Sequence, residues 1–242
     1  MSAYQTKQDS IAIAGAAHLN VRSLLDRNQF DDPLGDAEHV GISSATWPIF
    51  GMLWPSGMQL AARMAARSLH TGERILEIGC GLALPSLVAH RRGCNVTASD
   101  CHPMAAAFLQ ENWRLNNLPP LPYQFGQWGG ATKSVADHAH PVAATAQRAF
   151  MLPAVTGQFD LIIGSDVLYE RDSSGQLAAF IAQHAAPGAQ VWIVDPDRSN
   201  RPAFNQRMAA LGFTLDEERL DAPASVGAAA YKGRLLIYSQ RR

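Results

Sequence analysis

Arg-Ile-Leu-Glu-Ile-Gly-Cys-Gly, residues 74–81, is the stretch that decides the fold. Its aliphatic first half predicts a buried strand, and Gly79 and Gly81 then allow a sharp turn in which a ligand can approach the backbone. Residues 82–89 have the apolar spacing of a helix, and Gly93 marks its end. The order of strand, glycine turn and helix predicts a nucleotide site.

Two departures from the dinucleotide-binding pattern indicate which nucleotide is bound. Leu84 stands where that pattern has a third glycine to pack helix against strand. Glu77, just before the turn, would oppose a pyrophosphate and would suit a ligand with ammonium and sulfonium charge, such as S-adenosylmethionine. Asp100 ends the next predicted strand, 95–100, where a carboxylate can accept both ribose hydroxyls. Asp100 alone does not distinguish the two cofactors, because both use such an acid.

A purely structural interpretation stays open for the same residues. Gly79 and Gly81 could form only a tight connection, with Glu77 and Asp100 as solvated strand ends. The ordered succession of strand, turn, helix, second strand and terminal acid favours the nucleotide site.

The composition is that of one α/β domain. The chain has 242 residues, 47% of them hydrophobic, and a net charge of −1, so neither general nucleic-acid binding nor an anionic membrane partner is expected. Cys80, Cys94 and Cys101 lack Cys-x-x-Cys spacing and the histidines form no metal motif, so we expect neither disulfides nor a metal site. With no leader or membrane-spanning stretch in the sequence, we expect a cytoplasmic location.

Strand and helix patterns alternate along the rest of the chain. Helices are predicted over 103–116, 176–186 and 204–211, strands over 123–128, 159–166 and 189–195, and an antiparallel strand pair over 213–220 and 233–240. The predicted fold class is α/β, a Rossmann-like doubly wound seven-stranded sheet with a C-terminal antiparallel hairpin.

Ligands of such sheets bind at the carboxyl ends of the strands. The chain has these polar or aromatic side chains at or near the predicted strand ends: Glu77, Asp100, Trp128, Asp166 and Asp195.

Three motifs together resemble the class I, or seven-β-strand, S-adenosylmethionine-dependent methyltransferases. Glu-Ile-Gly-Cys-Gly at 77–81, Gln-Trp-Gly at 127–129 and Asp-Val-Leu-Tyr at 166–169 are similar to the glycine motif, the adenine-side tryptophan and the Asp-x-x-Tyr motif of the protein-lysine methyltransferases called methyltransferase family 16. The branch of that family that modifies the β subunit of electron-transfer flavoprotein is also similar at 53–57, 112–118 and 195–198.

Two regions fall outside this resemblance. Residues 1–45 are expected to form an N-terminal extension to a methyltransferase domain at 46–242. Within that domain, 129–157 are rich in Ala, Gly, His and Thr and predict an insertion loop. Both regions could alter the choice of substrate.

The resemblance implies S-adenosylmethionine as cofactor and assigns roles to individual residues. Asp166 would orient the incoming ammonium and Tyr169 would wall the channel, with a cation–π contact. Trp128 would stack on adenine, and Trp54 would close over the methionine end. The expected cofactor-binding residues are Trp54, Glu77, Gly79, Cys80, Gly81, Leu82, Asp100, Cys101, His102, Trp128, Ser165 and Asp166.

Each role has a structural alternative. Asp166 could cap a short helix with Tyr169 packed over it, and a tryptophan such as Trp54 is more often part of a core than a ligand platform. Asp195 and Arg198, on a loop that should face the substrate, could form a local ion pair.

The predicted function is an S-adenosylmethionine-dependent N-methyltransferase that acts on a lysine side chain of a protein. Val167 and Leu168 replace the two prolines found in enzymes that methylate planar base or amide nitrogens, which favours an sp³ amine. A small-molecule N-methyltransferase acting on a small amine and a non-catalytic S-adenosylmethionine-binding module stay open, and an NAD-dependent oxidoreductase is the most remote alternative. The sequence does not determine the oligomeric state.

Overall fold

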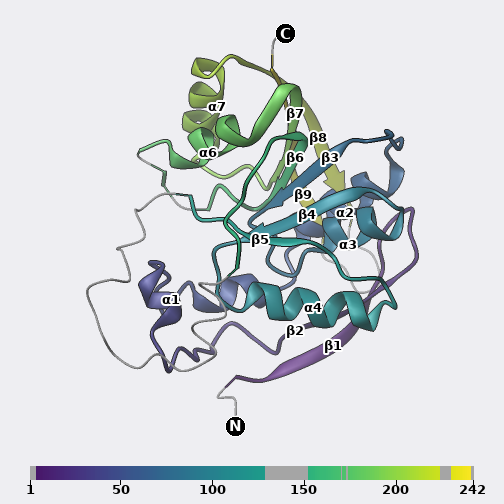
Figure 1. Ribbon diagram of the computed structural model, residues 1–242, viewed down its shortest axis with the longest axis vertical. Coiled ribbons are helices and arrows are strands. Elements are labelled where there is room, and N and C mark those ends of the chain that lie inside the picture. Colours follow the sequence, from purple (N-terminus) through teal and green to yellow (C-terminus); the bar gives the residue numbers. More distant parts are fainter. Residues whose placement is uncertain (1–3, 129–151, 170, 173, 224–229, 241–242) are drawn as a thin grey trace.

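The computed structural model describes residues 4–128, 152–169, 171–172, 174–223 and 230–240. A mixed sheet of seven strands forms its centre, in the spatial order β5-β4-β3-β6-β7-β9-β8 (Figure 1). In chain order the strands are β3 (Arg74–Ile78), β4 (Asn95–Asp100), β5 (Tyr123–Phe125), β6 (Phe159–Ser165), β7 (Ala185–Asp195), β8 (Phe213–Ala222) and β9 (Tyr231–Gln240).

The first strand of this sheet in chain order, β3, lies in its interior, and later strands are added first on one side of it and then on the other. β3 pairs in parallel with β4, and β4 with β5, after which the chain crosses back to place β6 on the other side of β3. The carboxyl ends of β3 and β6 therefore lie side by side where the winding changes direction, which is where such sheets bind ligands. This arrangement confirms the predicted doubly wound fold.

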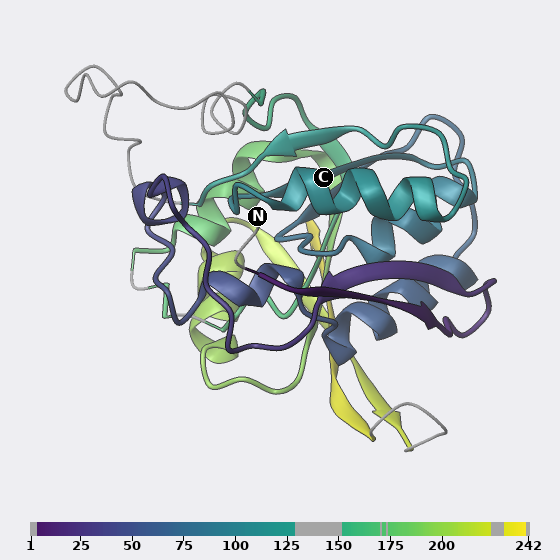
Figure 2. The same ribbon diagram turned by 90° about the horizontal axis from the view of Figure 1, so that it is seen from below.

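β8 and β9 pair antiparallel, as their sequence predicts. β9, rather than β8, adjoins the parallel part of the sheet, because it pairs antiparallel with β7 while β8 occupies the edge. Figure 2 shows the far ends of both strands projecting beyond the rest of the molecule.

Helices cover both faces of the sheet. Ile75 of β3 points into a hydrophobic cluster with α2, α3 and α4, whereas its neighbour Leu76 points into a second cluster with α6 and α7. This alternation along a strand is what allows one sheet to bury both faces. The helices are α2 (Pro55–Ala66), α3 (Leu84–Arg91), α4 (Ala105–Leu115), α6 (Gln176–His184) and α7 (Arg201–Ala210).

The N-terminal segment of the chain, up to residue 51, packs against helix α4 (Figure 1). It forms an antiparallel hairpin of β1 (Thr6–Ile11) and β2 (Leu19–Leu24), then helix α1 (Asp36–His39) and the 3-10 helix η1 (Trp47–Gly51). Leu19 and Val21 of β2 are fully buried in the same cluster as Phe108 of α4.

Two asparagines, Asn112 of α4 and Asn116 directly after it, hold this hairpin by its backbone. The buried Asn112 accepts a hydrogen bond from the backbone N–H of Arg22 at 2.8 Å, and Asn116 both donates to and accepts from the backbone of Asn20, at 2.7 and 3.0 Å. The predicted N-terminal extension therefore shares a core with the rest of the chain.

Most of the predicted insertion at 129–157 lies outside the described residues. Ala154, within its described end, forms an isolated parallel bridge with Phe125 at the end of β5. In the part of the chain that the structure describes, no helix combines the length and the apolar character needed to cross a bilayer.

Candidate functional site

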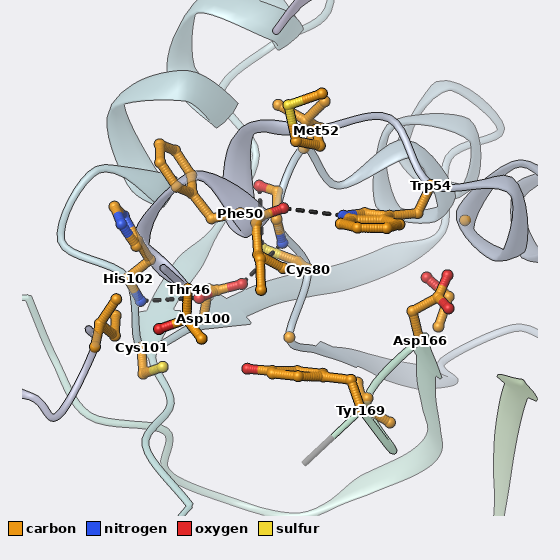
Figure 3. A pocket seen from close by; sticks show the side chains of 18 of the residues that line it. Thr46, Phe50, Met52, Trp54, Cys80, Asp100, Cys101, His102, Asp166 and Tyr169 are labelled. Atoms are coloured by element: carbon orange, nitrogen blue, oxygen red, sulfur yellow. Dashed lines mark hydrogen bonds between the residues drawn. The ribbon is translucent and has the colours of Figure 1, made fainter. Parts of the chain in front are cut away.

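A cavity of about 590 Å³ opens at the carboxyl ends of β3, β4 and β6 (Figure 3). Gly79 follows β3, Asp100 ends β4, and Asp166 follows β6, and all three line the cavity. Its volume is within the range of small-molecule and cofactor sites. The edge of the sheet that the topology predicts as a ligand site therefore carries a cavity of suitable size.

The glycine turn is shaped by the absence of side chains. Gly79 and Gly81 have φ of +57° and +50°, in the left-handed region that other residues rarely adopt. A Cβ on Gly79 would lie 3.0 Å from Trp128 and Val167, and a Cβ on Gly81 would lie 2.8 Å from the carbonyl oxygen of Phe50. Neither the φ angles of this turn nor the space around it therefore suits a residue with a side chain.

Asp100 joins this turn to the end of β4. Its Oδ2 accepts a hydrogen bond from the N–H of Gly81, and its Oδ1 accepts one from the N–H of His102, both at 2.8 Å. Burial raises the pKa of Asp100, and hydrogen bonds from the backbone at His102, Gly81 and Cys101 oppose that rise. Each carboxylate oxygen has a further lone pair, so the group can still accept hydroxyls from the cavity.

Glu77 is placed differently from the sequence-based expectation. The alternation of β3 turns its side chain beneath helix α3, where its Oε2 accepts a hydrogen bond from the backbone N–H of Ser86 at 2.8 Å. It satisfies a donor in the first turn of that helix and is absent from the cavity lining. Burial raises its pKa to about 8. The argument that its charge faces a cationic ligand is therefore corrected.

An aromatic stack borders the Asp100 side of the cavity. His102 stacks on Phe50 of η1 with ring centroids 3.7 Å apart, and Trp47 packs edge-on against it. Burial lowers the pKa of His102 to about 3, so the imidazole is neutral near pH 7. Burial also raises the pKa of the Cys80 thiol, which therefore stays protonated.

Asp166 marks the other side of the cavity. It has φ of +58°, a conformation that Asp and Asn tolerate better than most residues, and its N–H donates to the carbonyl of Val194 at 3.0 Å. Its Oδ1 accepts a hydrogen bond from Arg198 at 2.6 Å, whereas its Oδ2 is buried without a hydrogen-bond partner among the described residues. One oxygen of this carboxylate is thus held in place by Arg198, while the acceptor capacity of the other is unused among the described residues.

Arg198 is in turn anchored by Asp195, at the end of β7. The fully buried carboxylate of Asp195 accepts the N–H of Arg198 at 2.7 Å and lies 3.8 Å from its guanidinium. The ion pair considered for these two residues is present, and it extends to Asp166. Because Arg198 also lines the cavity, the pair belongs to the site.

Three aromatic side chains complete the walls. Trp54 precedes helix α2, and its Nε1 donates to the carbonyl of Ile49 at 2.9 Å. Tyr169 is 44% exposed, and Figure 3 shows its ring across the cavity from Trp54. Trp128 lines the cavity with a buried Nε1 that has no hydrogen-bond partner among the described residues.

The cavity gathers most of the residues that the sequence singled out, and some that it did not. Except for Glu77, the predicted site residues all line it: Trp54, Gly79, Cys80, Gly81, Leu82, Asp100, Cys101, His102, Trp128, Ser165, Asp166 and Tyr169. Sequence reasoning missed Arg27, Phe50 and the stretch 40–42. No motif marks them, because they lie far from the glycine turn along the chain. Among the described residues, no cluster of three or more His, Cys, Asp or Glu could hold a metal ion.

Comparison with known proteins identifies the family. A model of the methyltransferase domain matches residues 57–223. The chain belongs to the class I S-adenosylmethionine-dependent methyltransferases. It is of the methyltransferase family 16 type, and its cofactor is S-adenosylmethionine, as the sequence motifs predict.

Curated relatives of this methyltransferase act on proteins according to their names. This chain is 28% identical over 163 residues to the electron transfer flavoprotein beta subunit lysine methyltransferase of Danio rerio, and the match covers 66% of this chain and 54% of the relative. It is 30% identical over 146 residues to the histone-arginine methyltransferase METTL23 of Homo sapiens, covering 58% of this chain and 67% of the relative. The match to the Danio rerio enzyme thus spans about half of that relative's length.

A solved structure supports the fold of the methyltransferase independently. The crystal structure of a methyltransferase from Pyrococcus furiosus superposes with a TM-score of 0.53 at 22% identity, covering 74% of this chain and 81% of that one.

The residues present fit the cofactor. The side-chain-free turn at Gly79 and Gly81 leaves room for close approach to the backbone, and Asp100 offers carboxylate oxygens at the neighbouring strand end. The unpartnered buried Nε1 of Trp128 and Oδ2 of Asp166 are polar atoms that a ligand can satisfy.

Replacing Gly81 with Ala should abolish cofactor binding. The added Cβ would meet the carbonyl oxygen of Phe50 at 2.8 Å, so the turn must shift. Gly93→Ala is the matched control, because Gly93 has φ of +82° with open space around it and should cost only the backbone strain of about 1–2 kcal/mol. Calorimetric titration with S-adenosylhomocysteine checks this, and equal affinities of the two variants would contradict the role of the turn.

Glu77 should make the methyltransferase less stable as pH rises. Its pKa of about 8 in the folded protein exceeds its ordinary value of 4.5, so the unfolded chain ionises first. The contribution of Glu77 to stability is therefore complete below pH 4.5 and is lost as pH rises towards 8. Glu77→Gln should flatten this fall in the free energy of unfolding, measured by denaturant titration at several pH values. Glu38→Gln, at an exposed carboxylate, is the control.

Proposed function

We propose that this methyltransferase transfers a methyl group to the side-chain nitrogen of a lysine in a protein. The observation that carries the proposal is the state of Asp166, a residue of the cavity lining (Figure 3). Its Oδ1 is bound by Arg198, while its Oδ2 is buried without a hydrogen-bond partner among the described residues.

The chemistry requires a neutral, correctly aimed nitrogen. When bound, S-adenosylmethionine would supply the methyl group. The lysine ammonium first loses a proton to solvent, and its neutral nitrogen would then form the N–C bond as the S–C bond of the sulfonium breaks, with S-adenosylhomocysteine as the leaving group. Asp166 Oδ2 would accept a hydrogen bond from the N–H of the amine and so direct the nitrogen lone pair. The positive charge of Arg198 offsets that of the carboxylate, so the site does not hold the acceptor strongly in its ammonium form. Positioning, rather than a covalent intermediate, carries the catalysis.

The number of available oxygens favours lysine over arginine. A guanidinium is typically bound by a carboxylate through two parallel hydrogen bonds. At Asp166 the guanidinium of Arg198, 2.6 Å from Oδ1, already occupies one side of the carboxylate and prevents a second guanidinium from pairing with both oxygens in this way, so Oδ2 is the acceptor that stays without a partner among the described residues. A single acceptor suits an amine nitrogen better than a planar guanidinium.

The mouth of the cavity supports a protein acceptor. Val167 and Leu168 are buried, 6% and 3% exposed, whereas the next residue, Tyr169, is 44% exposed. An aromatic side chain standing in solvent beside the acceptor end offers a surface for the aliphatic stem and cation of a long side chain. The names of the curated relatives, which act on lysine or arginine of proteins, are consistent with this proposal.

Labelling a cell extract tests the proposal. The purified methyltransferase is incubated with the extract and S-adenosylmethionine labelled on its methyl group, and proteins are separated from small molecules. Label in a discrete protein band, found as methyl-lysine by mass spectrometry, would support the proposal. Methyl-arginine, label only among the small molecules, or no transfer at all would each overturn it.

Asp166→Asn should lower turnover about a hundredfold, because the amide oxygen would stay on the Arg198 donor and place an NH2 donor where the amine needs an acceptor, and a misplaced methyl acceptor costs about that much. Asn keeps the positive φ of the site, so the loss is not one of folding. Asp197→Asn is the matched control: Asp197 has φ of +61° and is ion-paired with Arg234 and Arg201, but lies outside the cavity lining. Unchanged turnover in Asp166→Asn, measured with the labelled acceptor, would refute this role.

A further inference from the structure

The N-terminal segment supplies one wall of the cofactor cavity. Arg27 and residues 40–42 line the cavity, although all precede the region that matches the methyltransferase domain, 57–223. This wall is joined to the segment just before Trp128, because the side chain of Gln127 donates to the carbonyl of Val40 at 3.3 Å. The segment is therefore placed to contact a bound cofactor.

Arg27 is a cation of this wall without an acidic partner. Arg198, the other arginine of the described lining, is engaged by Asp166 and Asp195. No carboxylate of the described residues pairs with Arg27, and its guanidinium lies 4.7 Å over the ring of Trp54. A guanidinium stacked on an aromatic ring is held by its face and keeps its N–H edge for a planar anion.

The position of Trp54 shows which part of a ligand would meet Arg27. Helix α2, which begins just after Trp54, lies next to the end of β6, because a Cβ on Gly57 would be 3.5 Å from the Oγ of Ser165. Figure 3 shows Trp54 near Asp166, with Asp100, Cys101 and His102 on the opposite side of the cavity. A ligand whose ribose lies at Asp100 therefore extends its far end towards Trp54.

We infer that Arg27 binds the carboxylate at the amino-acid end of S-adenosylmethionine. The Arg27 guanidinium matches the planar, bidentate geometry of a carboxylate, which Arg recognises better than Lys does. It would also supply the positive charge that this end of the cavity otherwise lacks, since Arg198 is neutralised by two acids. The inference rests on the cofactor and not on the identity of the methyl acceptor.

The test compares two ligands that differ at this end. S-adenosylhomocysteine carries the carboxylate, whereas 5′-methylthioadenosine lacks the whole amino-acid part. In Arg27→Ala the affinity for S-adenosylhomocysteine should fall about tenfold, the usual effect of losing one charge-assisted contact at an exposed site. The affinity for 5′-methylthioadenosine should change less than about twofold, and its retention shows that the cavity is folded. Calorimetric titration gives both constants.

Two further variants sharpen the result. Arg27→Lys should restore part of the affinity for S-adenosylhomocysteine, because the charge returns without the bidentate fork. Arg219→Ala, at an exposed arginine of β8, should change neither constant. If Arg27→Ala weakened both ligands equally, or neither, the inference would be overturned. A loss of affinity only for the protein substrate would overturn it as well, since Arg27 would then face the acceptor.

Discussion

The hydrogen bond from the N–H of Gly81 to the carboxylate of Asp100 is the contact on which the site depends. It joins the turn after β3 to the end of β4, so two segments that are separate in the sequence together form one side of the cofactor cavity. The same carboxylate fixes the start of the next segment through the N–H of His102. Because these donors belong to the backbone, they need no particular side chain, only a turn with the correct φ angles. A nucleoside can therefore be held by a surface that is largely main chain.

The parts of the fold that the sequence predicted are those with local causes. A buried strand ending at a glycine turn, as in 74–81, has a pattern that needs no distant partner, and the structure places β3 and α3 there. Helix α2 escaped prediction because it begins with Pro-Ser-Gly, and a helix with Gly57 in its first turn is supported by packing more than by propensity. Hairpin β1–β2 escaped because its backbone partners, Asn112 and Asn116, lie about ninety residues away.

The site follows the same division. Residues that directly follow strands, such as Asp100 and Asp166, could be placed from the topology alone, because parallel strands end at one edge. The orientation of Glu77 could not, since the strand pattern does not state which face helix α3 covers. The contact between Arg198 and Asp166 joins two loops, and only the register of β6 on β7 brings them to 2.6 Å. The place of Arg27 in the cavity lining could not be predicted for a third reason: a single arginine that precedes the motifs belongs to no recognisable sequence pattern.

The packing of the β1–β2 hairpin on α4 has a consequence for how the chain assembles. The hairpin is synthesised before α4, yet the hydrogen bond between Arg22 and Asn112 spans ninety residues. A two-stranded ribbon is marginal in water by itself, so during synthesis it must wait, with its apolar side uncovered, until α4 has emerged. Contacts of such sequence separation form slowly because the intervening loop must close first. A segment that precedes the sheet in the chain is thus among the last to pack, and the cofactor wall that follows it in sequence is completed only after the sheet has formed.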